Sequence, residues 1–287
     1  MIKRFTLIIY YILKFFDKVF LLLFKKGIFR WIKDFIHEDS YKKLNIDKKK
    51  IIFFIPNQLT EWRVDTFFTK EPETLEWINS FEKKKIVFWD IGANIGLYSI
   101  YNAIKNEESN TISFEPSSSN LRTLTRNISI NNLENRIKIF PIALNNKENS
   151  FLQMNEKNFV EGGALNSFGS NLNFEGKEFN AKMKYYTFGT TINYLLVNKI
   201  LDFPNYIKID VDGLEHLILE GASKLLDSNK LKSLSIEINE NYKVQYDKIL
   251  NIMKDKGYRI LHKKHNAELI HSGSAHSKTF NYIFLKR

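Results

Sequence analysis

The sequence D-I-G-A-N-I-G at residues 90–96 decides the fold of this chain. It follows the apolar run I-V-F-W at residues 86–89, which is typical of a buried parallel strand. Residues 97–104 then space their apolar side chains as a helix does. A strand, a glycine turn and a helix in this order form the βα unit of nucleotide-binding α/β folds, so the turn is the candidate ligand site.

The turn has the pattern D-x-G-x-N-x-G, which departs from the dinucleotide pattern G-x-G-x-x-G. Gly92 and Gly96 let backbone N–H groups approach a ligand, and Asn94 stands where a dinucleotide site has glycine. Asp90 suits a cationic group and disfavours a pyrophosphate. S-adenosylmethionine carries an ammonium and a sulfonium but no phosphate, so we expect these four residues to bind it. A dehydrogenase is disfavoured for the same reason.

Two further strands complete the expected donor site. Residues 111–115 end in Glu115, an acid placed to hold both ribose hydroxyls. Residues 137–141 form the third strand, and the exit of that strand usually lies beside the adenine, which makes Ala143 a candidate contact. A helix is expected between these strands, over residues 120–132.

Acidic residues end the next two expected strands. Residues 206–210 end in Asp210, and residues 234–239 contain Glu237 near their carboxyl end, where parallel strands face the ligand crevice. An acceptor hydroxyl needs a base to remove its proton or a metal to lower its pKa. Asp210 and Glu237 are therefore candidates for base or orienting group, or for ligands of a divalent ion, which is the less favoured reading. Asp212 and Glu215 fit a site role and a structural role equally well.

Four of the six histidines lie between residues 262 and 276, before the last expected strand at residues 280–285. A loop there could hold a general base over the crevice, and His265 is the first candidate. Loop histidines are more often solvated than catalytic.

The chain divides into three expected parts. Residues 1–50 form a basic, amphipathic helical extension, and residues 51–85 form a lead-in segment with a helix that begins near Pro72. Residues 86–287 form the main domain. Near residues 150–190 an insertion of loop and β-ribbon is expected, a plausible substrate-selecting lid.

The charge of the chain is concentrated in its first part. The net charge is +11, and residues 1–50 hold thirteen Lys and Arg against five Asp and Glu, so they carry +8 of it. The near-neutral remainder argues against a nucleic-acid partner, because such an enzyme lines its reaction cleft with basic residues. The chain has no cysteine, which excludes disulfides, Cys-ligated metals and thiol nucleophiles.

The first helix is amphipathic. Its polar residues fall within an arc of about 140°, and the rest of its surface is Leu, Ile and Phe; these residues are Lys3, Arg4, Tyr10, Tyr11, Lys14, Asp17, Lys18 and Lys25. Three mid-helix charges make a membrane-spanning helix unfavourable. The pattern fits either an anchor of residues 1–38 at an anionic membrane surface or a helix that packs on protein, in this chain or in a second subunit.

Several sequence blocks together resemble the FkbM family of methyltransferases. They are D-I-G-A-N-I-G-L-Y-S at 90–99, F-E-P at 114–116, R-N-I-S-I-N-N at 126–132, A-L-N at 143–145 and I-K-I-D-V-D-G-L-E-H at 207–216. The resemblance implies a class I methyltransferase, Rossmann-like α/β fold with a seven-stranded sheet of order 3-2-1-4-5-7-6 and helices on both faces. It also implies S-adenosylmethionine as donor and, in most members, O-methylation. Asn193 departs from the T-L-D sequence that members often show before the fourth strand.

We therefore expect an O-methyltransferase that acts on a sugar hydroxyl of a bacterial surface glycan, or of its nucleotide-linked or lipid-linked precursor. A non-sugar natural product is the alternative acceptor. A second alternative is a non-catalytic membrane-surface assembly subunit that keeps the fold. The expected location is the cytoplasm, with the inner face of the cytoplasmic membrane as a further option, and a homo-oligomer remains open.

Overall fold

The computed structural model describes residues 1–264 and 276–286. The chain forms two compact units, Met1–Lys42 and Lys43–Arg287. The second unit contains the large sheet and the ligand cavities, and it is described first.

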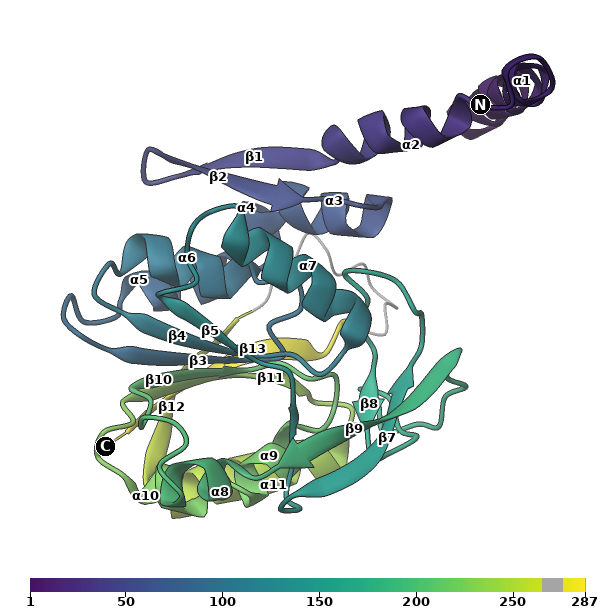
Figure 1. The fold of residues 1–287 in the computed structure, drawn as a ribbon. Helices are drawn as coiled ribbons and strands as arrows, with labels where there is room; N and C mark the ends of the chain where they lie inside the picture. Colours follow the sequence, from purple (N-terminus) through teal and green to yellow (C-terminus); the bar gives the residue numbers. More distant parts are fainter. Residues whose placement is uncertain (265–275, 287) are drawn as a thin grey trace. The chain divides into compact units, whose positions relative to one another are not determined.

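The central sheet has seven strands in the order β12-β13-β11-β10-β3-β4-β5 (Figure 1). Counted along the chain, this is the predicted order 3-2-1-4-5-7-6, so the expected fold class is confirmed. Strands β5, β4, β3, β10 and β11 are parallel, whereas β13 runs antiparallel to β11 and to β12. Their bounds are β3 Val87–Ile91, β4 Asn110–Phe114, β5 Ile137–Phe140, β10 Tyr206–Ile209, β11 Ser233–Asn239, β12 Tyr258–Lys264 and β13 Thr279–Lys286.

Helices cover both faces of this sheet (Figure 1). One face carries α5 (Pro72–Asn79), α6 (Leu97–Lys105) and α7 (Ser118–Ser129), and the other carries α8 (Ile192–Val197), α9 (Glu215–Glu220), α10 (Ser223–Asp227) and α11 (Lys243–Asp255). Each layer buries its apolar side chains against the sheet, which produces two separate cores. This sandwiching explains the continuous apolar sequence of the parallel strands.

A second, four-stranded sheet of order β6-β9-β7-β8 occupies the segment between β5 and α8. Its strands are β6 Ala143–Leu144, β7 Ser150–Glu156, β8 Ser167–Phe168 and β9 Met183–Thr190. β7 and β9 form the long antiparallel pair. The segment where loop and ribbon were expected therefore contains ordered strands and stands beside the carboxyl ends of the main strands.

Two predicted boundaries shift. The strand expected at 111–115 ends at Phe114, so Glu115 is the first residue beyond it. The helix expected over residues 120–132 spans Ser118–Ser129. After β10 the chain forms α9 and α10, which separate at Gly221, where a Cβ atom would lie 2.4 Å from the carbonyl oxygen of Asn145. The backbones approach too closely there for any side chain.

The unit Met1–Lys42 contains α1 (Ile2–Phe24) and α2 (Phe29–Glu38), and β1 (Tyr41–Ile46) begins at its boundary. We expected helical structure up to residue 50, but β1 pairs with β2 (Lys49–Phe54) instead. Asp47 and Lys48 both have positive φ, which is the backbone of a two-residue hairpin turn. Helices α3 (Gln58–Asp65) and α4 (Phe67–Lys70) lead into α5. In the described ranges, no helix combines the length and apolar character that crossing a lipid bilayer requires.

Candidate active site

Two cavities meet at the carboxyl ends of β3, β4, β10 and β11. The narrow cavity holds about 600 Å³ of space and the wide cavity about 1720 Å³, each partly open to solvent. Four residues line both cavities, namely Gly92, Asn94, Asp210 and Asp212. These four residues therefore form the border between the two cavities.

Gly92 begins the turn after β3 with a φ of 84°. Its N–H and that of Ala93 both donate to the carbonyl oxygen of Phe114 at 3.0 Å. A Cβ atom on Gly92 would lie 1.9 Å from the carbonyl oxygen of Asp210. Only glycine fits here, because the turn after β3 presses against the end of β10.

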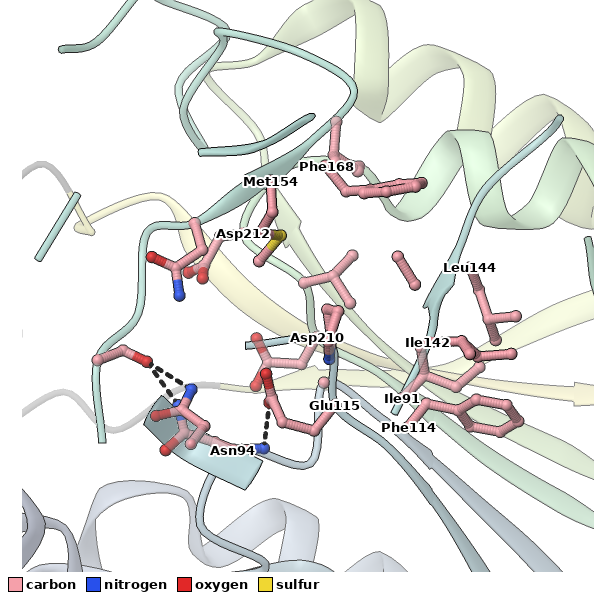
Figure 2. A pocket seen from close by; sticks show the side chains of 18 residues that line it. Ile91, Asn94, Phe114, Glu115, Ile142, Leu144, Met154, Phe168, Asp210 and Asp212 are labelled. Atoms are coloured by element: carbon pink, nitrogen blue, oxygen red, sulfur yellow. Dashed lines mark hydrogen bonds between the residues drawn. The ribbon is translucent and has the colours of Figure 1, made fainter. Parts of the chain in front are cut away.

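Asn94 and Glu115 join the turn to the end of β4. The Asn94 backbone N–H donates to Glu115 Oε2 at 2.7 Å (Figure 2). The Ser117 N–H donates to Oε1 at 2.9 Å. Burial raises the pKa of Glu115 to about 7, and these backbone donors oppose the rise. Each carboxylate oxygen keeps acceptor capacity for a ligand hydroxyl. Glu115 lines the narrow cavity, as expected for a ribose contact.

The narrow cavity is apolar at one end and polar at the other (Figure 2). Phe114, Ile142 and Leu144 form the apolar end, together with Ala143 at the start of β6. An apolar lining of this kind suits a planar, uncharged ring as ligand. Ala143 thus lies in the cavity where the sequence predicts the adenine contact.

Asp90 and Gly96 lie near the turn but line neither cavity. Asp90 is 1% exposed, and its Oδ2 accepts from Ser99 Oγ at 2.6 Å. Its Oδ1 has no hydrogen-bond partner in the described structure, and burial raises its pKa. Gly96 caps α6 with a φ of 88°, and a Cβ there would lie 2.6 Å from Leu124 Cδ1. Gly96 serves the packing of α6 against α7.

Asp210 lines both cavities and forms an ion pair with Lys208. Lys208 Nζ donates to Asp210 Oδ2 at 2.6 Å, and the lysine side chain is 2% exposed. Burial alone would lower the pKa of Lys208, but the charges of Asp210, Glu71 and Asp90 outweigh it and raise the pKa. Lys208 therefore stays charged within the fold.

A second ion pair lies in the same wide cavity. Lys70 Nζ lies 2.5 Å from Glu71 Oε1. Burial disfavours the charged form of Glu71, but Lys70 and Lys208 outweigh it and lower its pKa to about 2. Tyr98 also lines this cavity, and Lys208 Nζ lies 4.9 Å from the centre of its ring.

Glu237 also lines the wide cavity. No hydrogen bond joins its carboxyl to another residue in the described ranges. Burial, with the charges of Asp210 and Glu71, raises its pKa well above the ordinary value. Asp210 and Glu237, the two candidate carboxyls, thus line the same cavity. Asp210 forms an ion pair with Lys208, whereas Glu237 forms no hydrogen bond in the described ranges.

Asp212 and Glu215 hold the turn after β10 in place. Asp212, with a φ of 60°, accepts from the Leu165 N–H at 2.7 Å, and burial raises its pKa to about 6. Glu215 accepts from the N–H groups of Val211 and Gly213, and also from Gln245. Burial raises the pKa of Glu215 to about 8. Glu215 lines neither cavity and orders the turn, whereas Asp212 borders both cavities.

The loop at residues 160–166 borders both cavities. The Gly163 carbonyl accepts from Asn94 Nδ2 at 2.8 Å and from Asn120 Nδ2 at 3.1 Å. Asn120 Oδ1 also accepts from the Gly162 N–H at 2.9 Å, and Arg63 Nε donates to the Gly162 carbonyl at 2.7 Å. The turn at residues 90–96 therefore holds the loop directly through Asn94.

Among the histidines, His276 lines the wide cavity and stacks on Phe174 with ring centres 4.5 Å apart. His265, the candidate base chosen from the sequence, lies outside the described residues. Residues 1–264 and 276–286 contain no group of three or more His, Asp or Glu side chains that could hold a metal ion.

Sequence reasoning missed the lysines of the site. Lys208 was visible as the one cation in a buried strand, two residues before Asp210 and therefore on the same side of it. Lys70 and Glu71 had no such signal, because they reach the cavity from the connection between α4 and α5.

Comparison with known protein families finds a match to most of the second unit. The family described as methyltransferase FkbM domain matches residues 90–260, which is more than half of the chain. No curated protein matches the sequence.

Three solved structures illustrate the similarity in fold. An rRNA methylase from Streptococcus thermophilus is 11% identical with a TM-score of 0.44, covering 75% of this chain and 94% of its own. A precorrin-6y C5,15-methyltransferase from Geobacter metallireducens is 13% identical with a TM-score of 0.43, and the shares are 76% and 87%. TrmK of M. capricolum, in complex with S-adenosylhomocysteine, is 13% identical with a TM-score of 0.42, and the shares are 74% and 67%. The match of the family to residues 90–260 identifies this chain as a member of the FkbM methyltransferase family.

Proposed function

We propose that this enzyme binds S-adenosylmethionine in the narrow cavity and methylates a hydroxyl of a sugar in the wide cavity. The sugar belongs to a bacterial surface glycan or to its nucleotide-linked or lipid-linked precursor. The observation that carries the proposal is that Asp210 lines both cavities, while Glu237 lines the wide cavity.

The residues of the narrow cavity fit the donor. Glu115 would hold the ribose hydroxyls, and the apolar end at Phe114, Ile142 and Leu144 would hold the adenine. The buried Asn94 Oδ1 has no hydrogen-bond partner in the described structure, so it offers an acceptor beside the turn. Carboxylates of Glu115, Asp210 and Asp212 favour a cationic ligand over a phosphate. When bound, S-adenosylmethionine supplies an electrophilic methyl group.

The wide cavity favours an uncharged or weakly charged acceptor over a polyanion. Its ionisable lining includes more carboxyls than cations: Glu71, Glu73, Asp210, Asp212 and Glu237 against Arg63, Lys70 and Lys208. A nucleic-acid backbone would meet net repulsion there. Aromatic side chains also line the cavity and offer flat apolar surfaces to a ring: Trp62, Phe67, Tyr98, Phe174 and Phe280.

Asp210 is the proposed base. It lines both cavities, and its Oδ2 accepts from Lys208 Nζ at 2.6 Å. Its carboxylate would take the proton of the acceptor hydroxyl. The donor, when bound, would supply the methyl group to that oxygen and leave as S-adenosylhomocysteine. Glu237, with its raised pKa, lines only the wide cavity and orients the acceptor.

The test combines donor binding with product analysis. Isothermal titration with S-adenosylhomocysteine measures the donor site in the native protein and in Gly92→Ala. Incubation with S-adenosylmethionine and a panel of nucleotide sugars and glycan extracts is read by a mass gain of one methylene unit. We expect native binding, loss of binding in the variant, and methylation of one sugar class.

The variant Asp210→Asn should keep donor binding and lose about 10²–10⁴-fold in turnover. Absence of S-adenosylhomocysteine binding would contradict the donor assignment. Donor binding with methylation of a non-sugar product, and none of any sugar, would contradict the acceptor assignment. Unchanged turnover in Asp210→Asn would contradict the role of the base.

A further inference from the structure

One half of the α1 surface is apolar and uncovered. At 100° per residue, an uninterrupted apolar arc contains Phe5, Ile8, Ile12, Phe15 and Phe16. These side chains are between 48% and 64% exposed, and α1 has no buried residue. An apolar face of this size in a folded protein marks an interaction site.

Helix α2 packs on the polar side of α1. Asp17 Oδ1 accepts from the Phe29 N–H at 2.7 Å. The ring of Phe29 meets that of Tyr10 edge to face, with centres 5.6 Å apart, and Lys14 Nζ lies 4.6 Å from the centre of the Phe29 ring. Tyr10, Lys14 and Asp17 all belong to the polar arc. The partner helix within this unit therefore leaves the apolar arc open.

Basic residues border the apolar surface on both helices. Lys3, Arg4 and Lys18 lie in the polar arc of α1, and Arg30 and Lys33 lie on α2. Residues 1–42 hold nine Lys and Arg against four Asp and Glu. The one acid of α1, Asp17, is already engaged by α2, so the charge offered to a partner is positive.

Helix α2 adds aromatic and apolar side chains. Trp31, Phe35 and Ile36 are 52%, 60% and 61% exposed. Tryptophan is enriched where protein meets the headgroup region of a membrane. Arg30 lies 4.8 Å from the ring centre of Trp31, so a cation accompanies this aromatic side chain.

We propose that the α1–α2 unit, residues 1–42, binds the surface of an anionic lipid bilayer, with the apolar arc of α1 in the headgroup–acyl boundary. Lys3, Arg4 and Lys18 would contact lipid phosphates, because lysine and arginine stems reach past an apolar face to the polar layer. The proposal commits to lipid because the uncovered face combines apolar side chains with net positive charge. It does not depend on the acceptor of the methyl group.

The orientation is parallel to the membrane plane. Lys14, Asp17 and Lys18 lie in the middle of α1, where each would be costly in the hydrocarbon core of a bilayer. In a helix parallel to the surface, Lys14 and Asp17 would stay in the aqueous layer and Lys18 would reach the polar headgroup layer, while the apolar arc faces the bilayer interior.

The experiment uses the full-length chain and two kinds of vesicle. Flotation with phosphatidylcholine vesicles containing phosphatidylglycerol is compared with flotation on phosphatidylcholine alone. We expect binding to the anionic vesicles that weakens as salt is raised. The variant Lys3→Gln/Arg4→Gln/Lys18→Gln and the variant Ile12→Glu/Phe16→Glu should each bind the anionic vesicles at least about tenfold more weakly.

Phe151→Glu is the matched control, because Phe151 is an apolar residue of β7 with 69% exposure, outside the helical unit. It should float like the native protein. Equal flotation on neutral and anionic vesicles, or equal binding by all variants, would overturn the proposal. So would a lower melting temperature of Ile12→Glu/Phe16→Glu without lipid, or conversion of a dimer to a monomer by light scattering, since either result means that the arc packs on protein. Donor titration on the same samples separates this outcome from failure of the methyltransferase site.

Discussion

The ammonium group of Lys208 and the carboxylate of Asp210 lie 2.6 Å apart at the end of β10, on the side of the strand that faces the wide cavity. Lys208 also lowers the pKa of Glu71 and opposes the rise in the pKa of Asp90. One buried cation therefore compensates three acids around the place where the two cavities meet.

Replacement of Lys208 by methionine should destabilise the protein by about 3–5 kcal/mol, because removing one partner leaves a buried charge uncompensated. In the molecules of the variant that still fold, activity should be lost at a higher pH on the acidic side of the pH–rate profile. The reason is that carboxyls without a nearby cation hold their protons more tightly. Urea denaturation and pH-dependent kinetics measure the two effects.

The matched control is Lys248→Met, which breaks an exposed pair with Glu220 at 2.9 Å. This variant should lose less than about 1 kcal/mol of folding stability, and its pH–rate profile should match that of the native protein. An equal loss of stability in both variants would contradict the special role of Lys208.

Gly92→Ala should lose donor binding and about 2–4 kcal/mol of stability, because a Cβ would overlap the Asp210 carbonyl oxygen and φ is 84°. Gly257→Ala is the control, since Gly257 has a φ of 77° but nothing within 4 Å of the added Cβ. That variant should show only the backbone cost, about 1–2 kcal/mol, with full S-adenosylhomocysteine affinity. Similar effects of the two substitutions on stability and donor binding would mean that the positive φ alone accounts for the need for glycine at position 92.

Glu215→Gln should change how stability depends on pH. Burial raises the pKa of Glu215 to about 8 in the folded protein, so the folded state holds a proton that the unfolded state releases near its ordinary pKa of about 4.5. The contribution of the Glu215 carboxyl to folding stability is therefore complete at low pH and decreases as the pH rises to about 8. The variant lacks this loss, so its stability relative to the native protein should increase between pH 5 and pH 8, roughly the interval between those two values.

Urea denaturation at a series of pH values checks this result. The stability of the variant should start lower, because both carboxyl oxygens of Glu215 accept hydrogen bonds, from the N–H groups of Val211 and Gly213, whereas an amide has only one acceptor oxygen. Parallel stability curves across the whole range would contradict the prediction.

Asn120→Ala should release the loop at residues 160–166. The Asn120 amide bonds both the Gly162 N–H and the Gly163 carbonyl, so its loss should speed amide hydrogen exchange in the loop and weaken donor binding about tenfold or more. Arg122→Ala is the control, because the Arg122–Glu161 ion pair tethers the same loop from an exposed position. Arg122→Ala should change hydrogen exchange in the loop and donor binding only slightly. An equal effect of the two variants would contradict the role of Asn120 in holding the loop.

The sequence by itself determined the architecture and much of the donor site. The turn at 90–96 and the strands that end near Glu115 and Asp210 were visible because buried parallel strands and glycine turns leave local patterns. The sheet order followed from the family resemblance and is the order observed. Local pattern failed at Asp47 and Lys48, where two left-handed residues turn the expected helical extension into a hairpin.

Only the tertiary structure decided which residues share the cavities. Lys70 and Glu71 reach the wide cavity from a segment about 140 residues away from Asp210 in the chain, and the carbonyl of Gly163 meets Asn94 across 69 positions. The tertiary structure also shows that two glycines of the turn have different roles. Gly92 borders both cavities, whereas Gly96 packs against Leu124. Periodicity reports which face of an element is buried, whereas the pairing of distant side chains depends on how helices and loops pack onto the sheet.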